Sequence, residues 1–302
     1  MNPVRNSSGA LNPAGIILKS NPVTKQRGII SNGVKEERMR IVVCLKPVPD
    51  PKHWSRLALD PKTKTLIREG IPNIINPLDR KALEAALQLR EKEGGEVITM
   101  SMAPSSAMPV LREGLAMGAD LSILLSDLAF AGSDALATSY IMATAIRKLA
   151  PYDLILCGDQ TLDGSTSLVS AQIAEFLDIP NLMHVSAIEA QRSRVFHVRS
   201  QNEHGYMLVE MKAPLVLSVA KEINEPRYIT LMNILEGEKK EIRVWSSKDL
   251  SLSEPWVGLK GSPSQMADLF IPEAKRKVEI LQGDPSEMTK TLADRLHRMG
   301  YC

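Results

Sequence analysis

The sequence predicts an α/β fold built on a mostly parallel, doubly wound sheet. Two observations support this. After residue 38, short apolar runs alternate repeatedly with amphipathic helical patterns. The apolar runs are continuous, as in strands that are buried on both faces of a sheet. Strands joined in this way by right-handed helical crossovers form a parallel sheet, and such a sheet binds ligands at the carboxyl ends of its strands.

The first half of the pattern runs to residue 126. Its predicted elements are a strand at 40–45, a small exposed hairpin at 57–67, a helix at 78–93, a strand at 96–102, a helix at 105–117 and a strand at 121–126. The first strand is rich in β-branched residues, and the turn residues Asp60 and Pro61 lie within the hairpin. Gly94 and Gly95 end the first helix.

The second half begins with a helix that Ser133 or Asp134 can cap. The predicted elements are that helix through residue 149, a strand at 153–157, an amphipathic helix at 165–177, a hairpin between 194 and 211, a strand at 214–220 and a last amphipathic helix at 286–299. Beyond Pro180 the pattern is therefore richer in strands than the first half.

Three regions of different composition predict the domain organisation. Residues 1–38 are rich in Asn, Ser, Gly and Pro and have no acidic residue before Glu36, so we expect a disordered extension. A transit peptide or an over-extended start codon would also explain this segment. Residues 39–235 form the predicted α/β domain. Residues 236–302 are charged and proline-containing, and we expect an extended C-terminal arm.

Composition excludes several classes of protein. The chain has 302 residues, of which 44% are hydrophobic, and 37 basic against 35 acidic side chains give a net charge of +2. This charge offers no large basic field for nucleic acid. No apolar run reaches the roughly 20 residues that a membrane-spanning helix needs. Three cysteines are too few for a disulfide framework and favour a reducing compartment, so we expect the cytoplasm.

The common catalytic and metal-binding motifs are absent. The sequence contains no G-x-G-x-x-G after its first strand, no P-loop and no G-x-S-x-G. Its five histidines show no spacing typical of a metal site. Cys44 and Cys157 lie in or at the end of predicted strands, where they are best interpreted as small core residues. We therefore predict no catalytic residue and no metal site.

Polar loops follow the predicted strands, and the most informative is GDQTLDGSTSLVS at 158–170. Here Asp163, Gly164, Ser165 and Thr166 open a predicted helix. The free backbone N–H groups of a helix N-terminus, with neighbouring hydroxyls, can hold a phosphate. The same residues would also serve as ordinary helix caps. Both interpretations stay open on spacing alone.

A second constellation is the segment NEPRYITL at 224–231, directly after the strand at 214–220. Pro226 favours an extended turn, and charged residues flank it on both sides. A local salt bridge within a turn would explain these residues. Alternatively, an exposed apolar residue such as Leu231 would suit docking to a partner.

Five motifs in order resemble the β subunit of electron transfer flavoproteins. They are RIVVCLKPVPDP at 40–51, INPLDRKALEAAL at 75–87, REGLAMGAD at 112–120, GDQTLDGSTS at 158–167 and NEPRYITLMNI at 224–234. The resemblance runs from Met39 to the end of the chain, and NEPRY is its most specific part. It implies an adenine-nucleotide-binding α/β domain that pairs with an FAD-carrying α subunit. Such a pair transfers electrons between dehydrogenases, for example of the acyl-CoA type, and an acceptor, so this chain would be an electron carrier subunit.

The resemblance also implies which residues bind the nucleotide and the partner. The implied nucleotide-binding residues are Cys44, Asn76, Pro77, Leu78, Asp79, Met102, Gly158, Asp159, Gln160, Asp163, Gly164, Ser165, Thr166, Ser167 and Val169. The NEPRY segment corresponds to the family's recognition loop, which implies partner-binding roles for Arg227, Tyr228 and Leu231. In that family a leucine of this loop anchors to the partner dehydrogenase.

The identity of the nucleotide is a finer question. Common family members hold AMP, whereas the electron-bifurcating branch holds a second FAD that accepts a hydride from NADH. The segments 126–140 and 257–263, and the Asp163-Gly164 pair followed by Thr166, resemble the bifurcating or nitrogen-fixation-associated branch. That likeness adds Asp134 and Thr138 to the implied FAD-binding residues and favours FAD over AMP. Ala135 and Leu168 depart from that branch's pattern, which has a threonine and an amide there. A stand-alone adenine-nucleotide-binding module is the alternative from a different class.

Overall fold

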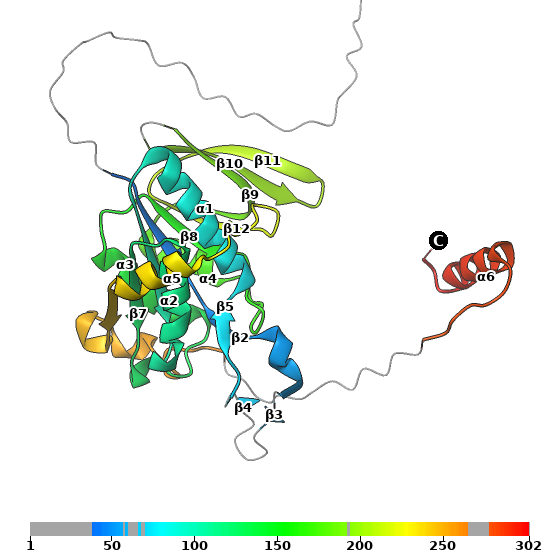
Figure 1. Ribbon diagram of the computed structural model, residues 1–302, viewed down its shortest axis with the longest axis horizontal. Helices are drawn as coiled ribbons and strands as arrows, with labels where there is room; N and C mark the ends of the chain where they lie inside the picture. The colour runs from blue at the N-terminus through cyan, green and yellow to red at the C-terminus, as the bar shows by residue number, and fades with distance from the viewer. Residues whose placement is uncertain are drawn as a thin grey trace, which may run out of the picture.

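The computed structural model describes residues 38–56, 58–59, 66–67, 70–191, 194–264 and 278–301. Its centre is a nine-stranded sheet of strand order β11-β10-β9-β12-β8-β1-β6-β7-β13 (Figure 1). The strands are β1 Arg40–Cys44, β6 Glu96–Met102, β7 Leu121–Leu125, β8 Leu154–Gly158, β9 Asn181–Gln191, β10 Val195–Asn202, β11 Gly205–Lys212, β12 Leu215–Val219 and β13 Ile242–Trp245. In this order every neighbouring pair from β9 to β13 is parallel, whereas β10 pairs antiparallel with both β9 and β11. The predicted fold class is confirmed.

Helices cover both faces of this sheet. They are α1 Pro77–Glu93, α2 Met108–Met117, α3 Ala135–Lys148, α4 Val169–Leu177 and α5 Leu231–Lys239. Alternate residues of β1 separate the two apolar layers. Ile41 and Val43 pack with α1 and α2, and Val42 packs with α3 and α4. A parallel strand buried on both faces therefore explains the continuous apolar run at residues 40–45.

Smaller elements decorate this core. Two short pairs of strands lie outside the main sheet: β2 Pro47–Pro49 with β5 Asn73–Ile75, and β3 Ala58–Leu59 with β4 Leu66–Ile67. The pair β3 and β4 matches the predicted hairpin, although its Asp60-Pro61 turn lies outside the described residues. Short 3₁₀ turns occur at Pro51–Arg56, Ser105–Ala107, Leu128–Phe130, Ser247–Asp249 and Glu254–Trp256.

The predicted cap of α3 is confirmed, and the predicted start of α4 is corrected. Asp134 caps α3 as expected, because its carboxylate accepts hydrogen bonds from the N–H groups of Leu136 and Ala137. The next helix, α4, begins at Val169 and not at Ser165. Ser165 and Ser167 have φ values of 48° and 54°, which belong to the left-handed region and cannot continue a right-handed helix. Residues 159–168 therefore form a loop above the sheet edge.

The α/β domain continues past residue 235, where the sequence predicted its end. Helix α5 packs on α2 through Gly237, since a Cβ at Gly237 would lie 2.8 Å from the backbone nitrogen of Ala116. Strand β13 then pairs with β7, and Leu250 is buried in the core. We therefore place the start of the proposed arm after residue 264.

The last helix, α6 Pro285–Arg298, lies apart from the sheet and its helices (Figure 1). No residue of α6 is buried. The expected disordered extension at residues 1–38 falls almost wholly outside the described residues. Among the helices that the structure describes, none combines the length and apolar composition needed to cross a bilayer.

Candidate functional site

The carboxyl ends of β1 and β8 lie side by side, and the buried Asp79 joins them. Its carboxylate accepts hydrogen bonds from the backbone N–H of Lys46, at 2.7 Å, and of Gly158, at 3.1 Å. Asp79 lies in the first turn of α1 and is only 4% exposed. Burial raises the pKa of Asp79 to about 7, although these hydrogen bonds oppose the rise. One side chain thus holds two strand ends and a helix start together.

Asn76 fixes the loop that follows β8. Its Nδ2 donates to the carbonyl oxygen of Gln160, at 2.9 Å, and its Oδ1 accepts from the N–H of Leu162, at 3.2 Å. At the beginning of the loop, a Cβ on Gly158 would lie 2.6 Å from Oδ1 of Asp79 and 2.7 Å from Cβ of Leu78. Only glycine permits this close approach of β8 to α1.

The loop itself carries hydroxyl groups and leads into the N-terminus of α4. Lys46 Nζ lies 2.6 Å from a carboxylate oxygen of Asp163. Burial raises the pKa of Asp163, but Lys46, together with hydrogen bonds from Thr161 and a backbone N–H, more than offsets burial, so the pKa lies below its usual value. No side chain caps α4. Left-handed residues next to a helix N-terminus form a backbone concavity suited to an anion, and Ser165 and Ser167 hold these positions.

A cavity of about 810 Å³ opens between this loop, the start of α1 and the turn of the β10-β11 hairpin. Seven of the implied nucleotide-binding residues line it: Asn76, Pro77, Leu78, Asp159, Gln160, Ser165 and Ser167. The volume lies within the range of roughly 300–1,000 Å³ that is usual for small-molecule and cofactor sites. The structure thus joins segments about 80 residues apart in sequence into one cavity.

The other implied residues do not line this cavity in the part of the chain that is described. Cys44 and Met102 end the neighbouring strands β1 and β6. The thiol of Cys44 contacts that of Cys157 and, with burial, raises the pKa of Cys157. Thr138 lies in the first two turns of α3. The remaining residues, Asp79, Asp163, Gly164, Thr166 and Val169, belong to the supporting α1 turn, the loop or the start of α4.

Asp134 joins the two segments whose sequences resemble the bifurcating branch. Its backbone N–H donates to Oγ of Ser262, at 2.8 Å, and its carboxylate accepts from the N–H of Ser264, at 3.0 Å. Oγ of the adjacent Ser133 accepts from the N–H of Gly258, at 3.1 Å. The segments at 126–140 and 257–264 therefore form one structural unit.

Sequence reasoning missed His184, which also lines the cavity. Its Nδ1 lies 2.9 Å from Asp159, whose carboxylate also accepts from Oγ of Ser218, at 2.5 Å. No local pattern could signal this arrangement, because His184 lies 25 residues from Asp159 in the sequence.

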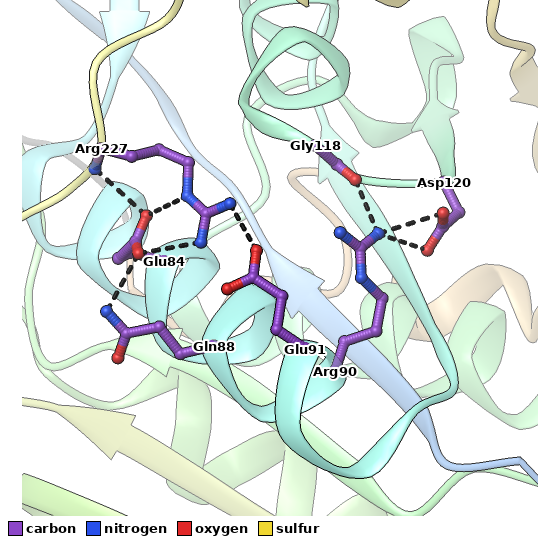
Figure 2. Close-up of polar contacts among 7 residues, drawn as sticks. All are labelled: Glu84, Gln88, Arg90, Glu91, Gly118, Asp120 and Arg227. Carbon is purple, nitrogen blue, oxygen red and sulfur yellow. Dashed lines mark hydrogen bonds and ion pairs between the residues drawn. The ribbon is translucent and has the colours of Figure 1, made fainter.

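The three implied partner-binding residues differ in their surroundings. Arg227 donates to the carboxylate of Glu84 from its Nε, at 2.8 Å, and to Glu91 from a terminal nitrogen, at 2.6 Å (Figure 2). This pairing lowers the pKa of Glu84 overall, although burial acts in the opposite direction. Tyr228 and Leu231 are 96% and 71% exposed. The arginine thus anchors the segment to α1, while the two apolar residues face outward.

Within the described ranges, no group of three or more His, Cys, Asp or Glu side chains is placed to hold a metal ion. The cavity offers instead backbone N–H groups, amides and hydroxyls. Those groups suit a phosphorylated organic ligand.

Comparisons with known proteins agree with this geometry. The family model described as "Electron transfer flavoprotein domain" matches residues 63–250. The β subunit of an electron transfer flavoprotein from Thermoanaerobacterium thermosaccharolyticum is 44% identical over 260 residues, which cover 86% of this chain and 98% of the relative. The caffeyl-CoA reductase-Etf complex subunit CarD from Acetobacterium woodii is 43% identical, with 85% and 98% covered. Protein FixA from Azorhizobium caulinodans is 40% identical, with 78% and 86% covered. The chain belongs to the electron transfer flavoprotein family, among its β subunits.

Proposed function

We propose that this chain binds FAD at the carboxyl edge of its sheet and works in a heterodimer with an electron transfer flavoprotein α subunit. The observation that carries the proposal is the cavity in which the start of α1 meets the loop before α4. Its hydroxyls and the uncapped helix fit the phosphates of a dinucleotide. A flavin bound there would supply the redox chemistry, and the chain's residues bind and orient it.

FAD is favoured over AMP by the unit formed around Asp134. The two segments that resemble the bifurcating branch are hydrogen-bonded to each other through Asp134, Ser262 and Ser264. That contact supports their acting together on one ligand. The similarity to CarD and FixA points in the same direction. With FAD in this site, NADH is the proposed hydride donor and bifurcation the proposed activity. AMP as a structural ligand is the second candidate.

The proposed partners follow from the exposed surface. Tyr228 and Leu231 are the proposed contacts to a flavin-dependent dehydrogenase, such as one of the acyl-CoA type. Arg227 supports them by anchoring the segment to α1. We place the assembly in the cytoplasm.

The test is to coexpress the chain with its α subunit, purify the complex and quantify the FAD and AMP released on denaturation. The proposal is supported if the complex releases more FAD than the α subunit binds and releases no AMP. AMP in place of that FAD would support the structural alternative. A chain that forms no complex but binds adenine nucleotides alone would favour the stand-alone module.

A matched pair of glycine variants locates the site. Gly158→Ala places a Cβ against Asp79 and Leu78, so we expect nucleotide to be lost. Gly237→Ala is the control, because its Cβ would lie 2.8 Å from the backbone nitrogen of Ala116 on α2, which is not part of the cavity lining. Equal nucleotide content in both variants, with both folded by circular dichroism, would contradict the assigned site.

A further inference from the structure

His184 is held in a defined orientation at the edge of the cavity. Its backbone N–H donates to Oδ1 of Asp159, at 3.0 Å, and its ring Nδ1 lies 2.9 Å from Oδ2 of the same carboxylate. Asp159 is 8% exposed and also accepts a hydrogen bond from the buried Ser218. The two bonds to Asp159 fix both the main chain and the ring of His184, so the ring is oriented before any ligand binds.

An irregularity of the backbone aims this side chain. In the pairing of β9 with β12, Leu217 faces Leu182, but Val219 faces Val185, so β9 has an extra residue there. His184 has a φ of 54°, in the left-handed region that residues other than glycine rarely adopt. Bulges of this kind redirect a side chain and are frequent beside functional sites.

The side of the imidazole ring that points away from Asp159 lines the cavity. The imidazole is 59% exposed and lines the same space as Ser165 and Ser167 of the loop before α4. Because Nδ1 is bound to Asp159, Nε2 is the ring atom left for a ligand. The imidazolium form presents an N–H there, and the neutral form with a proton on Nδ1 presents a lone pair.

We propose that His184, oriented by Asp159 and Ser218, donates a hydrogen bond from Nε2 to a phosphate oxygen of the nucleotide in this cavity. The inference rests on the proposed function, because it assigns a role within that nucleotide site. Phosphate oxygens accept charge-assisted hydrogen bonds from imidazolium.

The charged groups around the ring fit this assignment. Asp159 faces Nδ1 and compensates the imidazolium charge. From the other elements around the cavity come Glu203 of the hairpin turn and the paired Lys221 and Glu222 after β12. Glu203 makes no ion pair within the described residues. A protonated His184 would therefore offset the repulsion between Glu203 and a phosphate.

The experiment measures the affinity of the full chain, freed of nucleotide, for AMP and for adenosine by isothermal titration calorimetry. Titrations run at about pH 6, where an imidazole ring can carry two protons. The variant is His184→Asn, because an asparagine amide can reach Asp159 as Nδ1 does, tolerates a positive φ and lacks Nε2. His197→Asn is the matched control, since His197 pairs with Glu210 on the hairpin and is 41% exposed.

We expect His184→Asn to bind AMP about tenfold more weakly than wild type or His197→Asn. Adenosine affinity should be the same in all three proteins, because adenosine has no phosphate. AMP binding by His184→Asn equal to wild type would overturn the inference while leaving the nucleotide site intact. No AMP binding by the wild type would instead contradict the proposed site itself.

Discussion

Asp79 makes the domain less stable as pH rises, which is the opposite of the usual effect of a carboxyl group. Its pKa is about 7 in the fold against an ordinary value of 3.8, so between these values the folded chain holds a proton that the unfolded chain has released. The free energy of unfolding therefore falls as pH rises through this range, by about 4 kcal/mol in total for this one group.

Asp79→Asn tests this contribution, because the amide cannot titrate. We expect the free energy of unfolding of the variant, minus that of wild type, to rise by up to about 4 kcal/mol between about pH 4 and 8. Urea denaturation at several pH values measures it. Other carboxyls titrate equally in both proteins and cancel in the difference. A difference that does not change with pH would show that Asp79 is ionised throughout.

Arg227 shows how a single side chain can hold a partner-facing segment in place. Its guanidinium donates hydrogen bonds to Glu84, whose side chain is only 5% exposed, and to Glu91, which lies two turns further along α1 (Figure 2). Arg227→Ala leaves the Glu84 carboxylate buried without its cation, so we expect a loss of about 2–3 kcal/mol in unfolding free energy.

A double-mutant cycle with Glu84→Gln separates this pair from the remaining contacts. The coupling energy between the two substitutions should be about 1–3 kcal/mol, measured by chemical denaturation. Lys239→Ala is a control, because Lys239 forms an exposed pair with Glu236 and should change stability by less than about 0.5 kcal/mol. Additive effects of Arg227→Ala and Glu84→Gln would mean that the ion pair does not hold the segment.

At the scale of elements, sequence periodicity predicted every strand that is buried on both faces. The run at residues 40–45 and the run at 214–220 became β1 and β12, since continuous apolar residues have no other place in such a sheet. Strands with a partly exposed face were harder. β13 has the burial pattern of an edge strand, and its sequence contains no continuous apolar run. The sequence alone therefore could not distinguish β13 from an extended arm.

The sequence predicted those parts of the candidate site whose geometry depends on local chemistry. It did not predict the parts whose geometry depends on tertiary contacts. The Asn76-Pro77 start of α1 and the Asp134 cap follow from local chemistry. Ser165 and Ser167 adopt left-handed backbone conformations, so α4 begins only after them. Serine has no preference that would predict this conformation. His184 reaches the cavity through a bulge set by two neighbouring strands, which lies beyond any local pattern.

Helix α5 is held to the domain by one face and leaves the other free. Gly237 packs on α2, and Arg112 donates to the carbonyl oxygens of Gly237, Glu238 and Lys240 at its end. The exposed large apolar or aromatic side chains near its beginning are Tyr228, Leu231, Met232, Ile234 and Leu235. These residues are the proposed dehydrogenase contact.

Leu231→Ala should slow electron transfer from the dehydrogenase to the heterodimer while unfolding free energy stays within about 0.5 kcal/mol of wild type. Steady-state reduction of the complex at several concentrations of the heterodimer measures the first quantity, and a rise in KM is expected. Leu208→Ala is the control, as Leu208 is 60% exposed on β11. A loss of stability with unchanged electron transfer would make Leu231 a structural residue.

At the scale of the whole molecule, the chain divides into a domain that completes its own core and a C-terminal segment that does not. The core is closed by Leu250, and the contacts of Ser262 and Ser264 with Asp134 finish the domain. Helix α6 buries no residue, yet Leu292 on it and Met299 directly after it are apolar and exposed, as are Val278 and Ile280 before it. A helix with an unpaired apolar side is stable mainly through what packs on it. We propose that the α subunit covers this segment.

Truncation after residue 264 separates the two parts. Because α6 contributes no buried residue to the α/β domain, the truncated chain should unfold at the same urea concentration as the full chain. Its association with the α subunit should weaken by about tenfold or more, because exposed apolar side chains lose their partner surface. Copurification and analytical ultracentrifugation measure association. Leu292→Asp within the full chain is the matched test, since it removes the apolar side of α6 and keeps its length. A truncated chain that binds the α subunit as tightly as the full chain would place the subunit interface on the domain alone.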